Sequence, residues 1–345
     1  PLSPRVAMGC LCSKDEPPRN VAGGPGSPPP PAPPSPVRRG SFLAKETSQQ
    51  SVQFYTPFPE ELIGMHSNHG IKPKGYGAGA VAKINQDRGI VTFPLADSQE
   101  QMLIGVYDGH GPQGEKVSDW ACQELIELLE NESNKQLITP GAPTDNPCAT
   151  LGRCLFEVDE TLKAKPTVPS NESGSTAIVA LLRADRIFCG CVGDSRCVKG
   201  VRASNGKWKA VDLSVDQKPD DPKEQERILA AGGYVSPASA HTGPARVWQG
   251  TYGIGPGLAM GRSIGDHSVA NYGVIAVPEM TDTPCTDEDT VLILASDGVW
   301  EFMESQEAVD ICFKHSSNAT RACKALIDES ALRWRREEGN YRDDI

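Results

Sequence analysis

Three aspartates that close apolar runs constrain the fold of this chain more than any other feature of its sequence. Asp108 closes the run LIGVYD, Asp297 closes VLILASD, and Asp343 lies in the RDDI that ends the chain. Each run is about as long as a strand and is bounded by glycine, which predicts a buried strand. A carboxylate at a strand end lies at the rim of the core, where it is partly dry and still reachable. An Asp-Gly pair is equally typical of a hairpin turn, so that alternative stays open.

The order of the apolar segments predicts an α+β fold. We expect strands at residues 76–82, 89–93, 102–107, 177–182, 186–192, 196–201 and 291–295, and helices at 117–131, 149–162, 221–231, 305–315 and 320–335. Consecutive strands interrupted by paired helices argue against a doubly wound parallel sheet. The three runs between residues 177 and 201 are joined by short turns, which predicts an antiparallel meander.

Composition divides the chain into a tail (1–53) and one large domain (54–345). The Gly/Pro-rich stretch at residues 23–36 cannot bury apolar area and is expected to be disordered polyproline. The formal net charge is −11; residues 1–50 carry six Lys/Arg and three acids, so the remainder carries −14. An acidic body argues against nucleic acid as a partner. We expect a monomer.

Cysteine usage and hydropathy favour a cytoplasmic protein. The eleven cysteines are odd in number and lack zinc spacing, which favours a reducing compartment. Cys189 and Cys191 share one face of an expected strand and are predicted to be core thiols. No run approaches the roughly 20 apolar residues of a membrane-spanning helix.

The tail carries signals for lipidation and phosphorylation. If translation starts at Met8, the sequence MGCLCS matches a myristoylation pattern at Gly9, with Cys10 and Cys12 as palmitoylation candidates. The enzyme would then associate with a membrane surface. RRGS makes Ser41 a candidate phosphorylation site for basic-directed kinases, and PPSPVR is typical of a polyproline ligand. A solvated linker is the alternative for both segments.

Motifs around the three aspartates point to a family. They are ESGSTA at 172–177, VGDSR at 192–196, LAMGRSIGD at 258–266 and VPE at 277–279. In this order and spacing, from about Tyr76 to Ile345, the chain resembles the metal-dependent serine/threonine protein phosphatases of type 2C (the PPM family). The resemblance implies a central antiparallel β-sandwich flanked on both sides by helix pairs. It also implies hydrolysis of phosphoserine and phosphothreonine in protein substrates by water activated at a two-metal Mg²⁺ or Mn²⁺ centre.

The resemblance also implies roles for individual residues. Asp108 would bridge two metals, with the carbonyl of Gly109 as a ligand; Asp297 and Asp343 would hold the second metal; Asp194 and Glu301 belong to a third, weaker site. His110 matches the proposed general acid, a role that suits its near-neutral reference pKa. Converging carboxylates cannot all stay ionised without a cation, and oxygen-rich sites suit Mg²⁺ or Mn²⁺.

Two positions depart from the family pattern. Gln86 replaces a Glu that reaches a metal through water, so only Asp87 matches there. Ala82 stands where a phosphate-binding Arg is expected, and Lys83 beside it is the candidate substitute, with Arg88 as the alternative. These departures keep open a pseudophosphatase that acts as a binding or scaffold module. A cysteine-dependent phosphatase is excluded, because no cysteine is followed six positions later by Arg.

Three further expectations concern architecture. Arg262 and Asp266 are expected to pair across a turn beneath the site, and Trp300 is expected to anchor the core. The chain begins with Pro1 and ends directly after Asp344-Ile345, inside an expected strand. We expect a partial sequence that lacks its last strand, which would leave a neighbouring strand edge unpaired.

Overall fold

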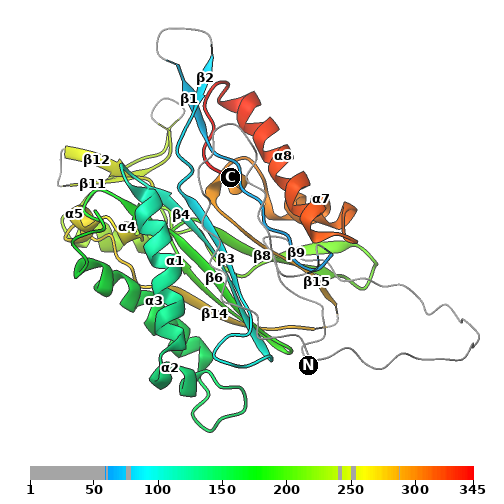
Figure 1. Ribbon diagram of the computed structural model, residues 1–345. Helices are drawn as coiled ribbons and strands as arrows, with labels where there is room; N and C mark the ends of the chain where they lie inside the picture. Colours follow the sequence, from blue (N-terminus) through cyan, green and yellow to red (C-terminus); the bar gives the residue numbers. More distant parts are fainter. Residues whose placement is uncertain (1–58, 60, 75–78, 240–242, 250–253, 287) are drawn as a thin grey trace, which may run out of the picture.

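The computed structural model describes residues 59, 61–74, 79–239, 243–249, 254–286 and 288–345. The tail positions Gly9, Cys10, Cys12 and Ser41 lie outside these ranges, as do residues 76–78 of the first expected strand. Within them the chain forms four layers, with two antiparallel sheets between two sets of helices (Figure 1). This arrangement confirms the predicted sandwich.

The larger sheet has seven strands. They are β3 (Asp87–Thr92), β4 (Gln101–His110), β5 (Gly174–Ser175), β6 (Ala177–Arg183), β7 (Arg186–Val192), β13 (Ile264–Gly265) and β14 (Glu279–Pro284). The order is β13-β5-β4-β6-β7-β14, and β3 pairs with β4 beside this path. The strand β4 therefore lies centrally, and its last residues face both β3 and β5.

The second sheet shows that the predicted meander is wrong. It consists of β15 (Asp289–Ala295), β8 (Arg196–Arg202) and β9 (Trp208–Asp212), in that order. Strands β6 and β7 do pair, but β7 then pairs with β14, and β8 belongs to the opposite sheet. The change of sheet follows Gly193, whose φ of +100° lies in a region that favours glycine. Short turns join strands within a sheet or between sheets, and periodicity alone does not distinguish these cases.

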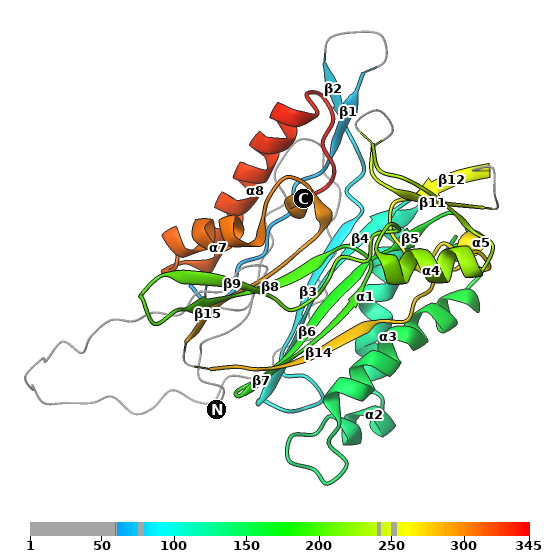
Figure 2. The ribbon, with the colours of Figure 1, turned by 180° about the vertical axis from the view of Figure 1, so that it is seen from behind.

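Helices cover both outer faces of the sandwich (Figure 2). The helices α1 (Gly114–Glu130), α2 (Glu132–Leu137) and α3 (Pro147–Lys163) belong to the side of the larger sheet, and α7 (Ser305–Lys314) and α8 (Ala319–Glu337) cover the smaller one. One apolar cluster lies between α1, α3 and the larger sheet. The other fills the space between the sheets and beneath α7 and α8, and it includes Cys189, Cys191 and Trp300, as predicted.

Smaller elements project from one end of the sandwich. The hairpin of β1 (Ile71–Pro73) and β2 (Ala80–Ala82) stands at the same end as a three-stranded unit of β10 (Tyr234–Ser236), β11 (Arg246–Gln249) and β12 (Ile254–Leu258) (Figures 1 and 2). The helix α4 (Pro222–Ala230) packs against β10 with its own small core. The short helices α5 (His267–Ala270) and α6 (Asp297–Trp300) complete the set. Among the described helices none is long and apolar enough to cross a membrane.

Candidate metal centre and active site

Two aspartates face each other across neighbouring strands. Asp87, the first residue of β3, is the register partner of Asp108 in β4. Directly opposed side chains of an antiparallel pair lie close together, and like charges there are destabilising. The Asp87 carboxylate accepts a hydrogen bond from Ser296 Oγ at 2.7 Å, and the Asp108 N–H donates to Thr176 Oγ1 at 3.0 Å. Asp108-Gly109 therefore belongs to a strand, and the hairpin-turn interpretation is wrong.

The second predicted ligand, Asp297, is the first residue of α6 and is separated from the end of β15 by one residue. Lys218 lies beside it, a residue that the sequence interpretation missed. The Lys218 ammonium donates to Asp194 Oδ2 at 2.6 Å. Burial lowers the pKa of Lys218, but the charges of Asp194, Asp297 and Glu301 outweigh it, so the net direction is upward. Lys218 sits in a loop without periodicity, so no pattern in the sequence singled it out.

The third predicted ligand lies outside any strand in the described residues. Arg342 forms an isolated β-bridge with Ile71, and Asp343 follows it in irregular backbone. The prediction that Asp343 lies in a strand is therefore wrong. Lys83 forms an ion pair with Asp343, and the Tyr341 hydroxyl donates to Asp343 Oδ2 at 3.1 Å. Lys83 is thus placed at the cluster.

Asp344 is a second site residue that the sequence interpretation missed. Its carboxylate accepts hydrogen bonds from the backbone N–H groups of Gly70 and Gln86, the latter at 3.0 Å. These bonds join the end of the chain to the segments on either side of the β1–β2 hairpin. The sequence offered only its place beside Asp343 as a signal.

The pKa values show that the carboxylates converge. Burial raises the pKa of Asp108 far above its usual range, and the charges of four aspartates add to it: Asp87, Asp297, Asp343 and Asp194. The pKa of Asp297 is likewise raised, by burial and then by Asp194 and Asp343. Burial and the charge of Asp344 raise the pKa of Asp87 to about 8. Such a cluster needs positive charge to ionise fully.

The donor set fits a hard divalent cation. Among the described residues no three Asp, Glu, His or Cys side chains stand in ready metal-ligating geometry. Yet Asp87 Oδ1 and Asp194 Oδ1 are buried oxygens without a hydrogen-bond partner within the described structure, as expected of atoms that lack a cation. Gly109 packs so closely on Gly114 and Gln86 that a Cβ would lie 2.6 Å from Gln86 O. Carboxylates and a backbone carbonyl are the oxygen ligands that Mg²⁺ and Mn²⁺ favour.

His110 pairs with an aspartate from a distant segment. At the end of β4, its Nε2 lies 2.5 Å from Asp266 Oδ2. Burial lowers the pKa of His110, but the charge and hydrogen bond of Asp266 outweigh this effect, so the net direction is upward. The expected Arg262–Asp266 pair is wrong. Arg262 Nη2 instead donates to Glu224 at 2.6 Å, because Glu224 is buried and needs a partner.

Gln86 and Arg88 are both occupied by local contacts. Gln86 Nε2 donates to Gly111 O at 3.0 Å and to Glu115 at 3.1 Å, so its amide joins the start of β3 to the first turn of α1. Arg88 donates to the carbonyls of Asn85 and Asp87. Lys83 is the better candidate for a phosphate contact, because its ammonium pairs with Asp343 of the acidic cluster, whereas the guanidinium of Arg88 bonds backbone carbonyls at the start of β3.

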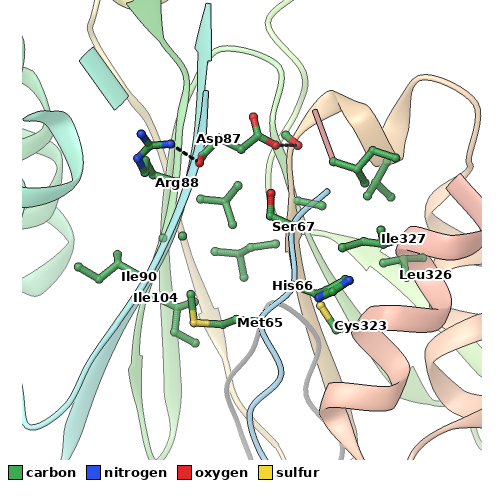
Figure 3. Close-up of a pocket in the computed structure, with 18 residues that line it drawn as sticks. Met65, His66, Ser67, Asp87, Arg88, Ile90, Ile104, Cys323, Leu326 and Ile327 are labelled. Atoms are coloured by element: carbon green, nitrogen blue, oxygen red, sulfur yellow. Dashed lines mark hydrogen bonds between the residues drawn. The ribbon is translucent and has the colours of Figure 1, made fainter. Parts of the chain in front are cut away.

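A cavity of about 70 Å³ lies beneath the acidic cluster, between β3, β4, β15 and α8. Figure 3 shows Asp87 at one end of it and the apolar side chains of Ile104, Leu326 and Ile327 around it. Neither Asp108 nor His110 lines it. The cavity is therefore separate from the part of the acidic cluster formed by Asp108 and from His110.

Comparison with known proteins places this arrangement in a family. The family model described as Protein phosphatase 2C matches residues 74–338. The chain belongs to the protein phosphatase 2C family. Like other members, it is a protein phosphatase by family, and phosphoproteins are the substrates that this membership implies.

Relatives and solved structures agree with this assignment. The chain is 35% identical over 271 residues to a probable protein phosphatase 2C 34 of Arabidopsis thaliana, covering 76% of this chain and 75% of that one. It is 37% identical over 254 residues to a probable protein phosphatase 2C 64 of Oryza sativa subsp. japonica, covering 73% of this chain but only 58% of the relative. A crystal structure of a serine-threonine phosphatase 2C from Toxoplasma gondii shares the fold, with a TM-score of 0.65 at 23% identity, over 81% of this chain and 96% of that one.

Proposed function

We propose that this protein phosphatase 2C chain is an active, metal-dependent phosphoserine/phosphothreonine phosphatase. The observation that carries the proposal is the convergence of Asp108, Asp194, Asp297 and Asp343 on one end of the sandwich, where burial and then the charges of the other three raise the pKa of Asp108. A pure binding module has no need to keep several buried carboxylates together at the cost of their mutual repulsion. An acidic cluster that binds cations explains the arrangement.

We assign the metal-binding and proton-donating roles to different residues. Asp108, Asp297, Asp343 and the Gly109 carbonyl would hold two Mg²⁺ or Mn²⁺ ions, and Asp194 with Glu301 a weaker third ion. When bound, the ions supply Lewis-acid stabilisation of the phosphoryl oxygens and activation of water. His110 would donate a proton to the leaving seryl or threonyl oxygen.

Lys83 would contact the substrate phosphate in place of the Arg that Ala82 replaces. The Lys83 ammonium forms an ion pair with Asp343 of the acidic cluster, and it lies 5.5 Å from the centroid of the Tyr341 ring. A lysine presents a point charge where an arginine forms a fork, so we expect weaker phosphate binding with chemistry retained.

A pseudophosphatase is the second candidate, favoured by two observations. Ala82 lacks the guanidinium group with which an arginine would bind phosphate. The Gln86 amide is neutral and is hydrogen-bonded to Gly111 and Glu115. Under that function the fold would bind a phosphoprotein without hydrolysing it.

Phosphate release from a phosphothreonine peptide distinguishes the two candidates. Active enzyme should release phosphate with Mn²⁺ and stop in excess chelator. Activity should survive alkylation of accessible thiols, because no thiolate takes part in the proposed chemistry, and burial raises the pKa of thiols such as those of Cys191 and Cys323. Absence of release with Mn²⁺, while the peptide still binds, would favour the pseudophosphatase.

We also propose that translation from Met8 gives a membrane-associated protein. One myristoyl chain at Gly9 binds reversibly, and stable anchoring takes a second signal such as acylation of Cys10 or Cys12. Gly9→Ala should move the protein to the soluble fraction of a cell lysate. A wild-type protein that is wholly soluble and carries no acyl mass would contradict the proposal.

A further inference from the structure

We infer that the Lys218 ammonium and a third divalent cation are alternative occupants of Asp194. Lys218 is then a cation tethered by the chain itself, and it limits the number of metal ions that the acidic cluster holds. The inference rests on the proposed metal centre and concerns the regulation of its third, weaker site. The ammonium keeps its proton in both states, and only its position changes.

The two carboxylate oxygens of Asp194 have different surroundings. Asp194 is fully buried in the turn between β7 and β8, and Lys218 donates to its Oδ2 at 2.6 Å. Its Oδ1 is a buried oxygen with no hydrogen-bond partner among the described residues. An ionised carboxylate that is removed from water needs positive charge beside it. The Lys218 ammonium supplies that charge.

The backbone before Lys218 is bonded to the turn that carries Asp194. Gln217 N–H donates to Gly193 O at 3.1 Å, and Gly193 N–H donates to Gln217 Oε1 at 2.7 Å. From another segment, Gly261 N–H donates to Gln217 O at 2.6 Å. Gln217 is itself buried. The loop is therefore held at the residue before Lys218, and the Lys218 side chain starts from a fixed position beside Asp194.

A second set of contacts fixes the same loop two residues before Lys218. Arg196, at the start of β8, donates to both carboxylate oxygens of Asp216, at 2.9 and 2.8 Å. Its guanidinium also donates to Ser305 Oγ at 3.0 Å and lies 5.0 Å from the centroid of the Trp300 ring. A bidentate pair with an arginine fixes orientation as well as distance. The loop is thus attached to β8, α6 and α7.

The side chain of Lys218 is the movable part of this arrangement. It is 30% exposed, whereas the side chain of Asp194 is 0% exposed. A lysine carries a point charge on a flexible stem, so the ammonium can turn toward water without any change in the loop. Asp194 then offers both oxygens to a divalent cation, which favours oxygen ligands. The two cations exclude each other, because like charges that share one carboxylate repel strongly.

Two further carboxylates make the position beside Asp194 attractive to a divalent cation. Burial lowers the pKa of Lys218, and the charges of Asp194, Asp297 and Glu301 together outweigh this effect. All three carboxylates therefore lie within electrostatic reach of one ammonium. A divalent cation brings twice the charge of a lysine to the same place, but it has to displace the lysine first. The third site therefore fills only at higher metal concentration.

Counting bound metal tests the inference without any turnover. Mn²⁺ is titrated calorimetrically, and electron paramagnetic resonance counts the Mn²⁺ that stays free. Lys218→Met removes the charge and keeps the length of the side chain, and Lys218→Gln takes its place if the first variant does not fold. We expect these neutral variants to bind a third ion at least about tenfold more tightly than the wild type, because a charge in direct contact is removed. Lys207→Met, an exposed charge removal in the turn between β8 and β9, is the matched control.

A second substitution separates the site at Asp194 from a general change in electrostatics. Adding Asp194→Asn to Lys218→Met should abolish the gain, and Lys218→Arg, which keeps the charge, should bind Mn²⁺ as the wild type does. The same number of ions bound with the same affinity in the wild type and the neutral variants would overturn the role of Lys218 and leave the two-ion centre intact. A gain that survives Asp194→Asn would also overturn it. Absence of Mn²⁺ binding in the wild type and in every variant would contradict the metal centre itself, and the inference with it.

Discussion

At the residue scale, two lysines supply the only side-chain cations that are paired within the acidic cluster in the described structure: Lys83 with Asp343 and Lys218 with Asp194. Burial opposes the charge of each ammonium, and the neighbouring carboxylates outweigh it and raise both pKa values. Both lysines therefore stay charged at neutral pH and offer positive potential to a phosphate.

Lys83→Ala should raise the KM for a phosphothreonine peptide about tenfold, equivalent to 1.4 kcal/mol and near the net worth of a charge-assisted hydrogen bond. Ala82→Arg should lower the KM. Lys72→Ala removes an exposed charge from the same hairpin and is the control. If neither Lys83→Ala nor Ala82→Arg changes the KM in steady-state assays, the phosphate contact lies elsewhere.

At the element scale, α6 and the end of the chain are in direct contact. A Cβ on Gly298 would overlap the carbonyl of Asp344, and Trp334 Nε1 donates to Gly298 O at 2.8 Å. This contact fixes Asp297 relative to Asp343 and Asp344. Three acidic residues from two segments, Asp297 in α6 and Asp343 and Asp344 at the end of the chain, thus meet at Gly298.

Gly298→Ala should lower the free energy of unfolding by about 2 kcal/mol, within the range for overpacking a rigid site. Urea denaturation measures it. Gly89→Ala is the matched control, since its Cβ would meet the mobile end of Met65 at 3.0 Å and should cost less. Equal losses of unfolding free energy in Gly298→Ala and Gly89→Ala would show that the contact between α6 and the end of the chain deforms at little cost.

The α4 element depends on a buried ionic network. Glu224 accepts hydrogen bonds from Arg262 and from Arg227, the latter at 2.6 Å, and Arg227 also donates to Gly261 O at 2.7 Å. Burial raises the pKa of Glu224, but the two arginines outweigh this and lower it below its ordinary value. A carboxyl with a lowered folded pKa stabilises the fold above the unfolded pKa, about 4.3, and loses this as the pH falls through the folded pKa.

Glu224→Gln should therefore destabilise the protein at pH 7 by about 3 kcal/mol, because it removes the buried carboxylate that pairs with both guanidinium groups and leaves Arg262 with Glu279 as its acidic partner. The difference from wild type should shrink as the pH is lowered through 4 toward 3, where Glu224 itself becomes neutral. Urea denaturation at several pH values checks the trend, with the exposed Glu226→Gln on the same helix as control. A difference that is independent of pH would contradict the charged network.

At the scale of the whole molecule, the apolar patterns predicted an α+β fold, and the resemblance to the type 2C phosphatases predicted the layers and most of the acidic cluster. The runs before Asp108 and Asp297 are long, apolar and bounded by glycine, so both strands and their polar ends were accessible to pattern reasoning. The change of sheet after Gly193 could not be predicted from such patterns, because β7 and β8 have similar apolar patterns and only their packing assigns them to different sheets. Lys218 and Asp266 were missed as site residues, since their partners lie 24 and 156 residues away and depend on tertiary contacts.

Divalent metal should stabilise the molecule as a whole, because it relieves the repulsion among the buried carboxylates. At about 100 times the dissociation constant, a ligand that binds only the folded state adds about 2.7 kcal/mol. Mn²⁺ should therefore raise the thermal midpoint of the wild type, and Asp297→Asn should reduce the rise. A midpoint that does not respond to Mn²⁺, or responds equally in Asp297→Asn, would argue against metal at α6.

Calorimetric titration of Mn²⁺ into wild type, Asp108→Asn and Asp185→Asn tests most directly whether the acidic cluster is a metal centre. Both variants remove one negative charge, but Asp108 lies at the centre of the cluster and Asp185 is exposed at a distant turn. We expect saturable binding in the wild type and in Asp185→Asn, and at least about tenfold weaker binding in Asp108→Asn, since a neutral amide is a poor bridge between two cations. Identical binding in all three proteins, or none in the wild type, would contradict the metal centre.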